Sequence, residues 1–427
     1  MKTSGEWIAA VQTGALDGAL ARLYAPDGVE QARQRAASVL NDFQSAFDPG
    51  ADVMLFSAPG RTEIGGNHTD HQHGRVLCGS VDMDMLACAA PNGLKVIRVH
   101  SSGYAPVQVE LDSLLPRTEE LNTTAALVRG VAAQISKLGY PVGGFDVTMT
   151  SDVLPGSGLS SSAAFEVLMG NIINRFFCGG ALDAVEIAKI GQYAENIYFG
   201  KPCGLMDQMA CSVGGVVSID FTEPMSPSVC RVDCDLDRFG YALCIVDTGS
   251  CHADLTDDYA DITREMGAVA AYFGVQVLRD VPESDFRAAI PALRETCGDR
   301  AVLRAMHFYE DDRRAAQEAD ALDADEFDCF LALVNASGLS SELKLQNAWS
   351  VGAPTQQAIP LALAEGRRLL NGSGAIRVHG GGFAGTIQAF VPNDRLEEFK
   401  TGMENLLGPG KCHVMRIRSQ GGCALID

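Results

Sequence analysis

The chain has 427 residues, of which 47% are hydrophobic and 20% are charged, a composition typical of a folded globular protein and not of a disordered one. Its formal net charge of −21 indicates an acidic surface, which repels nucleic acids and anionic membranes. No apolar run of about 18 residues appears and the N-terminus lacks a signal-peptide pattern, so we expect a cytoplasmic protein without a membrane span. The 13 scattered cysteines lack zinc-ligand spacing and are expected to be reduced thiols.

The helical and strand patterns along the chain give a coarse picture of an α+β fold in two halves, with glycine-rich loops in both. The length exceeds the size at which single cores usually stop growing, so we expect two domains, residues 1–224 and 225–427. In chain order we predict helices within 1–50, strands at 53–56 and within 95–111, a helix at 122–138, a strand at 144–150, helices at 162–177 and 183–200, and strands at 213–221 and 241–248. Helices at 256–274 and 313–350 and strands at 375–378 and 386–391 follow.

Residues 154–164, LPGSGLSSSAA, join a predicted strand to a predicted helix. The glycines allow close approach of the backbone, the N–H groups at a helix start point outward, and serine hydroxyls add donors or a metal ligand. All three properties suit a phosphate group. The segment matches neither the P-loop nor the Rossmann pattern, so a serine-rich helix cap remains the alternative.

Residues 58–74 carry an unusual density of hydrogen-bonding side chains, among them Arg61, Asn67, His68 and Asp70. A sugar needs such a cluster, because each of its hydroxyls both donates and accepts hydrogen bonds. A solvated loop is the alternative. A metal site formed by the neighbouring histidines is less favoured, because nothing in the spacing fixes a ligand geometry.

Two further segments are candidates for the active site, one with a pair of carboxylates and one rich in glycine. Glu195 and Asp207 lie on either side of a turn, which suits a division of labour between metal binding and proton transfer, although both could be surface acids. The segment 379–386, HGGGFAGT, contains four glycines that are costly to order. Its backbone therefore needs either unusual angles, close approach to a ligand, or a tight turn between strands.

The order of these motifs, PGR…HTD, PGSGLSSSAA, CGxMDQ and GGGFxG, resembles the galactokinase branch of the GHMP kinases over roughly residues 50 to 391. The resemblance implies a two-domain α+β fold with the active site in the cleft between the domains. It also implies transfer of the γ-phosphate of ATP to the anomeric hydroxyl of D-galactose or a close relative, with Mg²⁺ as cofactor. The expected partners are therefore a sugar and ATP, and we expect a monomer or weak homo-oligomer.

The resemblance also implies roles for individual residues. Asp207 would lie beside the C1 hydroxyl, and Arg61 would flank both Asp207 and the transferring phosphate. The implied sugar ligands are Asn67, His68, Asp70, Gly204 and Tyr259. The implied nucleotide ligands are Gly156, Gly158, Ser160, Ser161, Ser162, Gly381 and Gly382, and the implied magnesium ligands are Ser161 and Glu195.

The sequence departs from the family signature GEHxDYxGG at 66–74, which reads GNHTDHQHG. Asn67 replaces the glutamate that receives the 6-hydroxyl, and an asparagine would not repel a carboxylate at C6. The pair His71-Gln72 also resembles plant galacturonate kinases, which makes galacturonate the leading alternative substrate. A second departure is the lack of a tryptophan at 122–127, so we expect the base to stack differently.

Two other functions remain open at this stage. A catalytically silent sugar- and ATP-binding regulator would use the same binding motifs, but the presence of Arg61, Glu195 and Asp207 with an intact serine loop favours an enzyme. A GHMP kinase for another small alcohol, such as homoserine or mevalonate, is disfavoured by the HTD and CGxMDQ segments.

Overall fold

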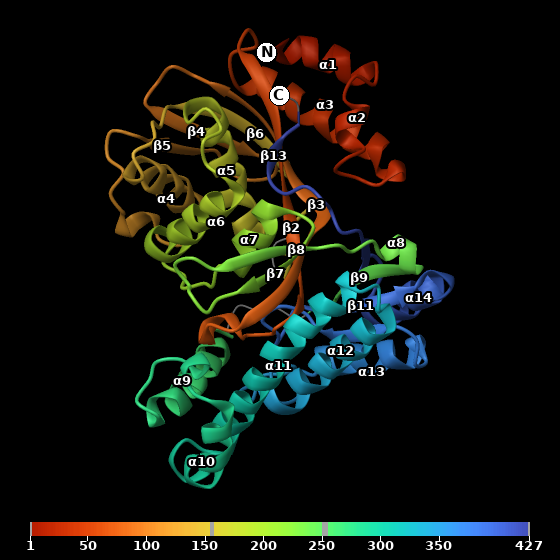
Figure 1. Ribbon diagram of the computed structural model, residues 1–427. Helices are drawn as coiled ribbons and strands as arrows, with labels where there is room; N and C mark the ends of the chain where they lie inside the picture. Colours follow the sequence, from red (N-terminus) through yellow and green to blue (C-terminus); the bar gives the residue numbers. More distant parts are fainter. Residues whose placement is uncertain (1, 154–157, 250–254, 426–427) are drawn as a thin grey trace.

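The computed structural model describes residues 2–153, 158–249 and 255–425, and it is built around two β-sheets (Figure 1). One sheet has nine strands and the other has four, and helices cover both. This arrangement confirms the predicted α+β fold. Within the described ranges no helix is long and apolar enough to cross a lipid bilayer, and the 12 described cysteines are free thiols.

The nine-stranded sheet depends on two long antiparallel strands, β2 (Asp52–Gly65) and β3 (Arg75–Pro91). Its main order is β1-β2-β3-β6-β4-β5; in addition, β7 pairs with β3, β8 pairs with β7, and β13 pairs with β2. The remaining strands are β1 (Lys2–Thr3), β4 (Val96–Ser101), β5 (Val107–Glu110), β6 (Phe145–Ser151), β7 (Val216–Asp220), β8 (Ser228–Val232) and β13 (Cys423–Ala424).

The apolar run at the start of β2 is buried on both faces of this sheet. Val53 and Leu55 pack in a core with α3, whereas Met54 and Phe56 pack in a core with α4 and α5. A strand buried on both faces reads as a continuous apolar run instead of an alternating one. The helices of this part are α1 (Ser4–Gln12), α2 (Asp17–Leu20), α3 (Val29–Ala46), α4 (Thr124–Lys137), α5 (Ser161–Phe177), α6 (Ala184–Tyr193) and α7 (Met206–Val213).

The four-stranded antiparallel sheet has the order β10-β11-β9-β12 and lies in the lower part of Figure 1. Its strands are β9 (Tyr241–Asp247), β10 (Ala375–Val378), β11 (Thr386–Pro392) and β12 (Cys412–Met415). The helices of the second half are α8 (Leu236–Phe239), α9 (Thr256–Tyr272), α10 (Glu283–Thr296), α11 (Asp299–Asp323), α12 (Phe327–Ser340), α13 (Ala358–Leu370) and α14 (Leu396–Leu407). Helix α11 contacts β2 and β3 and so joins the two parts.

Two features differ from the sequence-based expectation. The helix predicted at 313–350 is instead the end of α11 followed by α12, because Asp325 adopts a left-handed conformation (φ +58°) that interrupts the helix. Two strands beyond residue 224, β8 and β13, pair within the nine-stranded sheet. The predicted boundary at 224/225 therefore does not separate the two sheets cleanly, and the division into domains stays a prediction.

A buried carboxylate connects the N-terminal helices, the sheet and the C-terminal segment. Asp84 on β3 accepts hydrogen bonds from Tyr24 (2.5 Å), Arg35 (2.8 Å) and Arg418 (3.1 Å). Burial disfavours its charge, but the two arginines outweigh burial and lower the pKa of Asp84. The ion cluster therefore holds three segments of the chain on one strand.

We predict that Asp84→Asn lowers the free energy of unfolding by about 3–5 kcal/mol, because it leaves the buried Arg418 without its counter-charge and removes one of the two carboxylates that pair with the largely buried Arg35. Urea unfolding of the purified variant measures this loss. The matched control is Asp17→Asn, since Asp17 pairs with Arg33 at 2.7 Å on the surface and its removal is expected to cost only about 0–1 kcal/mol. Equal stability of the two variants would contradict the prediction.

Candidate active site

The described end of the serine loop lies against β2. Arg61 N–H donates to the carbonyl oxygen of Leu159 (3.1 Å), and the guanidinium Nη1 donates to the carbonyl of Gly158. A side chain at Gly60 would come within 2.9 Å of Leu159 O, so glycine is needed there for the close approach. Ser160 adopts a left-handed conformation (φ +57°) and immediately precedes α5. The N–H groups at the start of α5 are thereby presented beside Arg61, while the predicted ligand Gly156 lies outside the described residues.

Arg61 binds Asp207 through two parallel hydrogen bonds. Nε lies 2.7 Å from Oδ1 and Nη2 lies 2.8 Å from Oδ2 of Asp207, which stands in the first turn of α7. Ser160 Oγ donates to the same carboxylate. Burial raises the pKa of Asp207, but the charge and hydrogen bonds of Arg61 with the Ser160 bond outweigh it and lower the pKa below its usual value. The expected meeting of guanidinium and carboxylate is present in the structure.

Glu195 lies in a π-helical segment, Ala194–Phe199, directly after α6. Its Oε1 accepts a hydrogen bond from Ser162 Oγ (3.1 Å), and its Oε2 accepts one from Gln208 Nε2 (2.9 Å). The sequence analysis expected Ser161 to share a magnesium ion with Glu195, and that role stays a prediction; the hydroxyl that donates to Glu195 is that of Ser162. Consecutive residues point about 100° apart around a helix, and at the start of α5 it is Ser162 that faces Glu195.

The oxygen atoms at this place suit a hard cation. A carboxylate and a hydroxyl are ligands that Mg²⁺ accepts together with phosphate oxygens. Among the described residues no group of three or more His, Cys, Asp or Glu side chains could hold a metal ion alone. A magnesium ion beside Glu195 would therefore depend on nucleotide phosphates for most of its shell.

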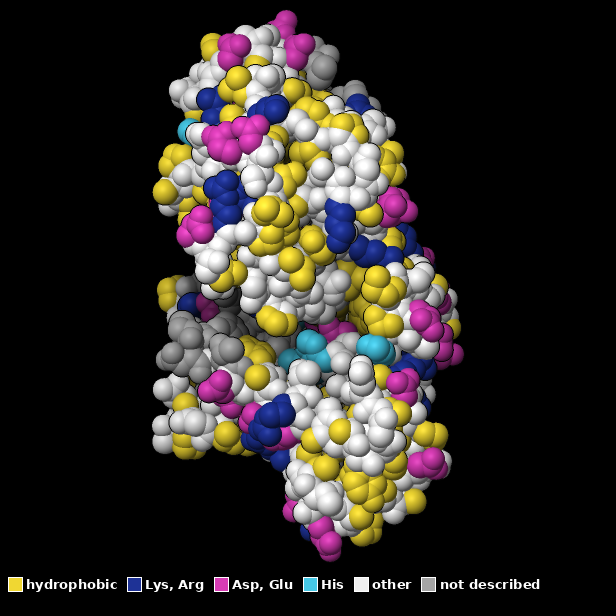
Figure 2. All heavy atoms as spheres, turned by 90° about the vertical axis from the view of Figure 1, so that its left-hand side faces the viewer, with side chains coloured by type: hydrophobic (Ala, Val, Ile, Leu, Met, Phe, Trp, Pro, Cys, Tyr) yellow, Lys and Arg dark blue, Asp and Glu magenta, His cyan; other side chains and the backbone are white. Residues whose placement is uncertain are grey.

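Two of the predicted sugar-binding residues, His68 and Tyr259, lie next to each other, with ring centroids 6.5 Å apart. Histidine side chains gather at the narrow middle of the molecule, its waist, in Figure 2. His68 Nε2 lies 3.0 Å from Gly381 O, and the Tyr259 hydroxyl donates to Gly382 O at 3.0 Å. A side chain at Gly204 would come within 2.0 Å of Asp70 Oδ2, so Gly204 must lack one. Burial, followed by the charge of His71, lowers the pKa of His68 to about 4. This side chain is therefore neutral near pH 7.

The side chain of Asn67 is fully buried within the protein instead of facing the waist. Its amide nitrogen donates to Glu63 Oε1 and to Gly380 O, both at 2.8 Å. Its amide oxygen accepts bonds from Ser341 Oγ (3.1 Å) and Asn347 Nδ2 (2.8 Å). All four hydrogen-bonding positions of the amide are used. This geometry argues against the prediction that Asn67 contacts the C6 substituent of a sugar.

Two residues of the site were missed in the sequence. Gln208 Nε2 donates to both Glu195 and Glu166 (3.0 Å), and it stands one position after Asp207 within the CGxMDQ motif. Lys201 Nζ lies 3.4 Å from Glu195 Oε1. Its position in the turn between two candidate carboxylates, Glu195 and Asp207, could have identified Lys201 from the sequence.

A cavity of about 290 Å³ adjoins the serine loop. Ser161 and Ser162 are among its lining residues, and so is Tyr104, which has 65% of its surface exposed and therefore lies at the rim. The lining combines apolar side chains with hydroxyl groups and includes Val99, Leu127, Phe165, Ser101 and Thr124. Its position beside the loop and its apolar character suit a flat aromatic base attached to phosphates.

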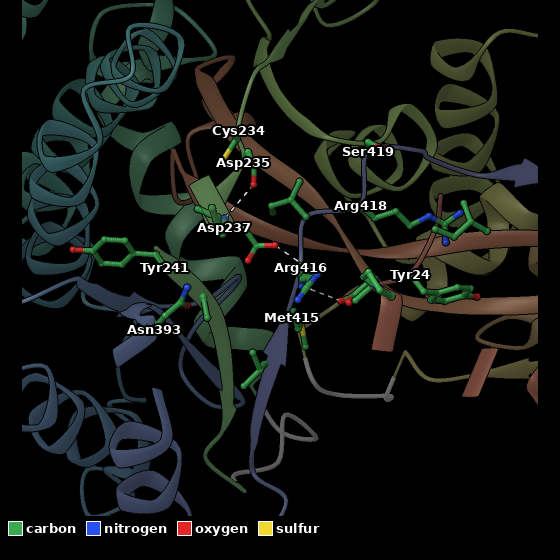
Figure 3. Close-up of a pocket in the computed structure, with 18 of the residues that line it drawn as sticks. Tyr24, Cys234, Asp235, Asp237, Tyr241, Asn393, Met415, Arg416, Arg418 and Ser419 are labelled. Atoms are coloured by element: carbon green, nitrogen blue, oxygen red, sulfur yellow. Dashed lines mark hydrogen bonds and ion pairs between the residues drawn. The ribbon is translucent and has the colours of Figure 1, made fainter. Parts of the chain in front are cut away.

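A larger cavity, of about 570 Å³, contains none of the predicted site residues. It lies between the N-terminal helices, the start of β9 and the segment that follows β12 (Figure 3). Arg416 Nη1 faces Asp237 there at 3.5 Å, and the backbone N–H of Arg416 donates to Asp82 (3.0 Å). Arg416 and Asp237 are thus paired with each other in this cavity.

Comparisons with known proteins agree with this arrangement. The family of GHMP kinase N-terminal domains matches residues 126–215, and the galactokinase galactose-binding signature matches residues 41–91. The chain is 30% identical to the galactokinase of Streptomyces coelicolor over 79% of its length and 84% of the relative. It is also 30% identical to the galactokinase of Actinobacillus pleuropneumoniae, over 80% of its length and 86% of the relative.

Two solved structures show the same fold. The galactokinase of Lactococcus lactis complexed with galactose superposes with a TM-score of 0.76 at 23% identity, covering 90% of this chain and 97% of that one. The mevalonate kinase of Methanococcus jannaschii superposes with a TM-score of 0.58 at 15% identity, covering 86% and 98%.

We predict that Asn67→Glu destabilises the protein by about 2–4 kcal/mol, because the new carboxylate would face Glu63 Oε1 and Gly380 O, which are both acceptors. Urea unfolding measures the loss. The control Asn67→Gln keeps an amide and separates the effect of charge from that of size. The prediction is wrong if the glutamate variant is as stable as the unsubstituted protein and prefers a different C6 substituent. Residue 67 would then contact the sugar directly.

Proposed function

The chain belongs to the galactokinase family of the GHMP kinases, and on that premise we propose that it transfers the γ-phosphate of ATP to the anomeric hydroxyl of D-galactose or a close relative. The observation that carries the proposal is the bidentate pair of Arg61 and Asp207 beside the serine loop. Phosphoryl transfer needs positioning and charge stabilisation more than covalent chemistry. A fixed carboxylate next to a guanidinium supplies both.

Asp207 acts on the hydroxyl that attacks. Its lowered pKa keeps the carboxylate ionised, so it can orient the C1 hydroxyl by accepting its hydrogen bond. The hydroxyl becomes acidic as its oxygen bonds to phosphorus, and the proton can then pass to Asp207. Arg61 stabilises negative charge on the transferring group while holding the carboxylate in place.

The start of α5 and the serine loop receive the phosphates in this proposal. The N–H groups at the helix start and the hydroxyls of Ser160, Ser161 and Ser162 suit phosphate oxygens. Mg²⁺, held by Glu195 and the Ser162 hydroxyl, would neutralise charge on the triphosphate. The cavity beside Ser161 would hold the base, with Tyr104 at its rim as the aromatic group in place of the absent tryptophan.

The sugar would lie between His68, Asp70, Gly204 and Tyr259. Asp70 and the neutral imidazole of His68 can bind hydroxyl groups, and the lack of a side chain at Gly204 leaves room beside Asp70. The galacturonate alternative rested largely on Asn67 facing C6, and its buried amide removes that basis. We therefore favour galactose. A cytoplasmic location and a monomeric or weakly associated state complete the proposal.

We predict that the protein releases ADP with galactose, ATP and Mg²⁺, and that galactose has a higher kcat/KM than galacturonate, N-acetylgalactosamine, arabinose or glucose. A coupled ADP-release assay across these sugars measures the order. Chelation of divalent cations should abolish turnover, since the triphosphate charge is then left uncompensated. Binding of both substrates without turnover of any sugar would indicate a silent regulator instead.

We predict that Asp207→Asn lowers kcat by about 10²- to 10⁴-fold, the usual contribution of a positioned general base, with little change in galactose affinity. Coupled assays measure kcat, and calorimetry measures galactose binding. Asp237→Asn, in the separate cavity of Figure 3, is the matched control and should behave as the unsubstituted protein. Turnover of the Asp207 variant within a factor of three would remove this residue from the mechanism.

A further inference from the structure

Lys201 lies in the turn between the two carboxylates of the site. Gly200, in a left-handed conformation (φ +88°), ends the π-helical segment, and the backbone N–H of Lys201 then donates to the carbonyl of Glu195 (3.2 Å). This turn brings the lysine side chain back over Glu195, where Nζ lies 3.4 Å from Oε1. The side chain is nevertheless 63% exposed, so it borders the open side of the site.

The two oxygens of Glu195 have different surroundings. Oε1 receives the hydroxyl of Ser162 (3.1 Å) and the ammonium of Lys201, so it faces the start of α5. Oε2 receives the buried amide of Gln208 and so faces the interior. The ammonium of Lys201 thus lies on the side where the serine loop would present phosphates.

Of the two cationic side chains at the site, Arg61 and Lys201, Lys201 is the more available to bind phosphate. Three N–H groups of Arg61 are already used by Asp207 and Gly158. Lysine carries a positive charge near pH 7, and the ammonium of Lys201 lies beside Glu195 Oε1 on the exposed side of the site. A triphosphate brought here adds several negative charges to these carboxylates, and phosphoryl transfer requires cations that stabilise them.

We propose that Lys201 is a further catalytic residue, whose ammonium binds oxygens of the transferring phosphate. The inference rests on the proposed kinase function. A divalent ion bound at Glu195 Oε1 would repel the ammonium, and the flexible four-carbon stem allows Lys201 to turn toward the phosphates. In that position it supplements Arg61 by stabilising charge that Asp207 and Glu195 would otherwise oppose.

A simpler role for Lys201 is an ion pair with the buried carboxylate of Glu195, without any contact to phosphate. Three variants distinguish the two roles: Lys201→Met removes the charge, Lys201→Arg keeps it, and Lys189→Met is a matched control. Lys189 stands on α6, close in sequence, and donates to the carbonyl of Met225 at 2.9 Å, away from the site. Each variant is assayed for kcat and KM, and for binding of Mg²⁺ with a non-hydrolysable ATP analogue by calorimetry.

We expect Lys201→Met to lower kcat by about 10- to 100-fold and to weaken binding of the analogue with Mg²⁺ by ~3- to 10-fold, as for loss of a charged hydrogen bond. Lys201→Arg should recover part of both losses, and Lys189→Met should show neither. Values within a factor of two of the unsubstituted protein for Lys201→Met would overturn the proposal. If the unsubstituted protein phosphorylates none of the sugars, the proposed function fails, but the binding measurement still decides whether Lys201 contacts phosphate.

Discussion

The guanidinium of Arg61 joins three segments that lie far apart in the chain. It reaches from β2 to Gly158, 97 positions away, and to Asp207, 146 positions away. Because the side chain is buried, its charge requires a partner, and Asp207 provides two hydrogen bonds in the geometry that guanidinium favours. The positions of the serine loop and of α7 relative to the sheet depend on this pair.

The second half of the chain is attached through a different set of buried groups. Asn67 and Glu63 from β2 and the loop after it bind Gly380, Asn347 and Arg377, all beyond residue 340. The cost of burying these polar groups is offset only when every partner is present. The glycine-rich segment 379–386 is therefore held against the predicted sugar-binding segment 66–74 by buried side chains. These side chains can do so without contacting a substrate.

Glycines set the spacing of these contacts. Gly60 allows the serine loop to approach β2, and Gly204 allows Asp70 to occupy the space where a side chain would otherwise lie. The same is true of Gly381, where a side chain would come within 2.4 Å of the Tyr259 ring. The glycine-rich motifs thus serve close packing between segments as well as the approach of a ligand.

Much of the local structure could be predicted from the sequence. The helices within residues 1–50 and the strand beginning at Val53 depend on neighbouring residues, whose spacing can be seen in the sequence itself. The segments that form the site could also be identified. Glycines, serines and paired carboxylates at these spacings are typical of only a few kinds of binding site. Where α11 ends and α12 begins was not predicted, because one left-handed residue decides it.

The sequence by itself determined which chemical groups the protein has for its reaction, namely an arginine, carboxylates, a serine loop and a sugar-binding loop. The tertiary structure alone decided which of them face one another. It paired Glu195 with Ser162 and not with Ser161, enclosed Asn67 in a network of partners from the second half, and turned Lys201 back over Glu195. The physical reason is that a side chain's direction and hydrogen-bond partners depend on helix phase and on contacts between distant segments, and neither is contained in the spacing of one motif.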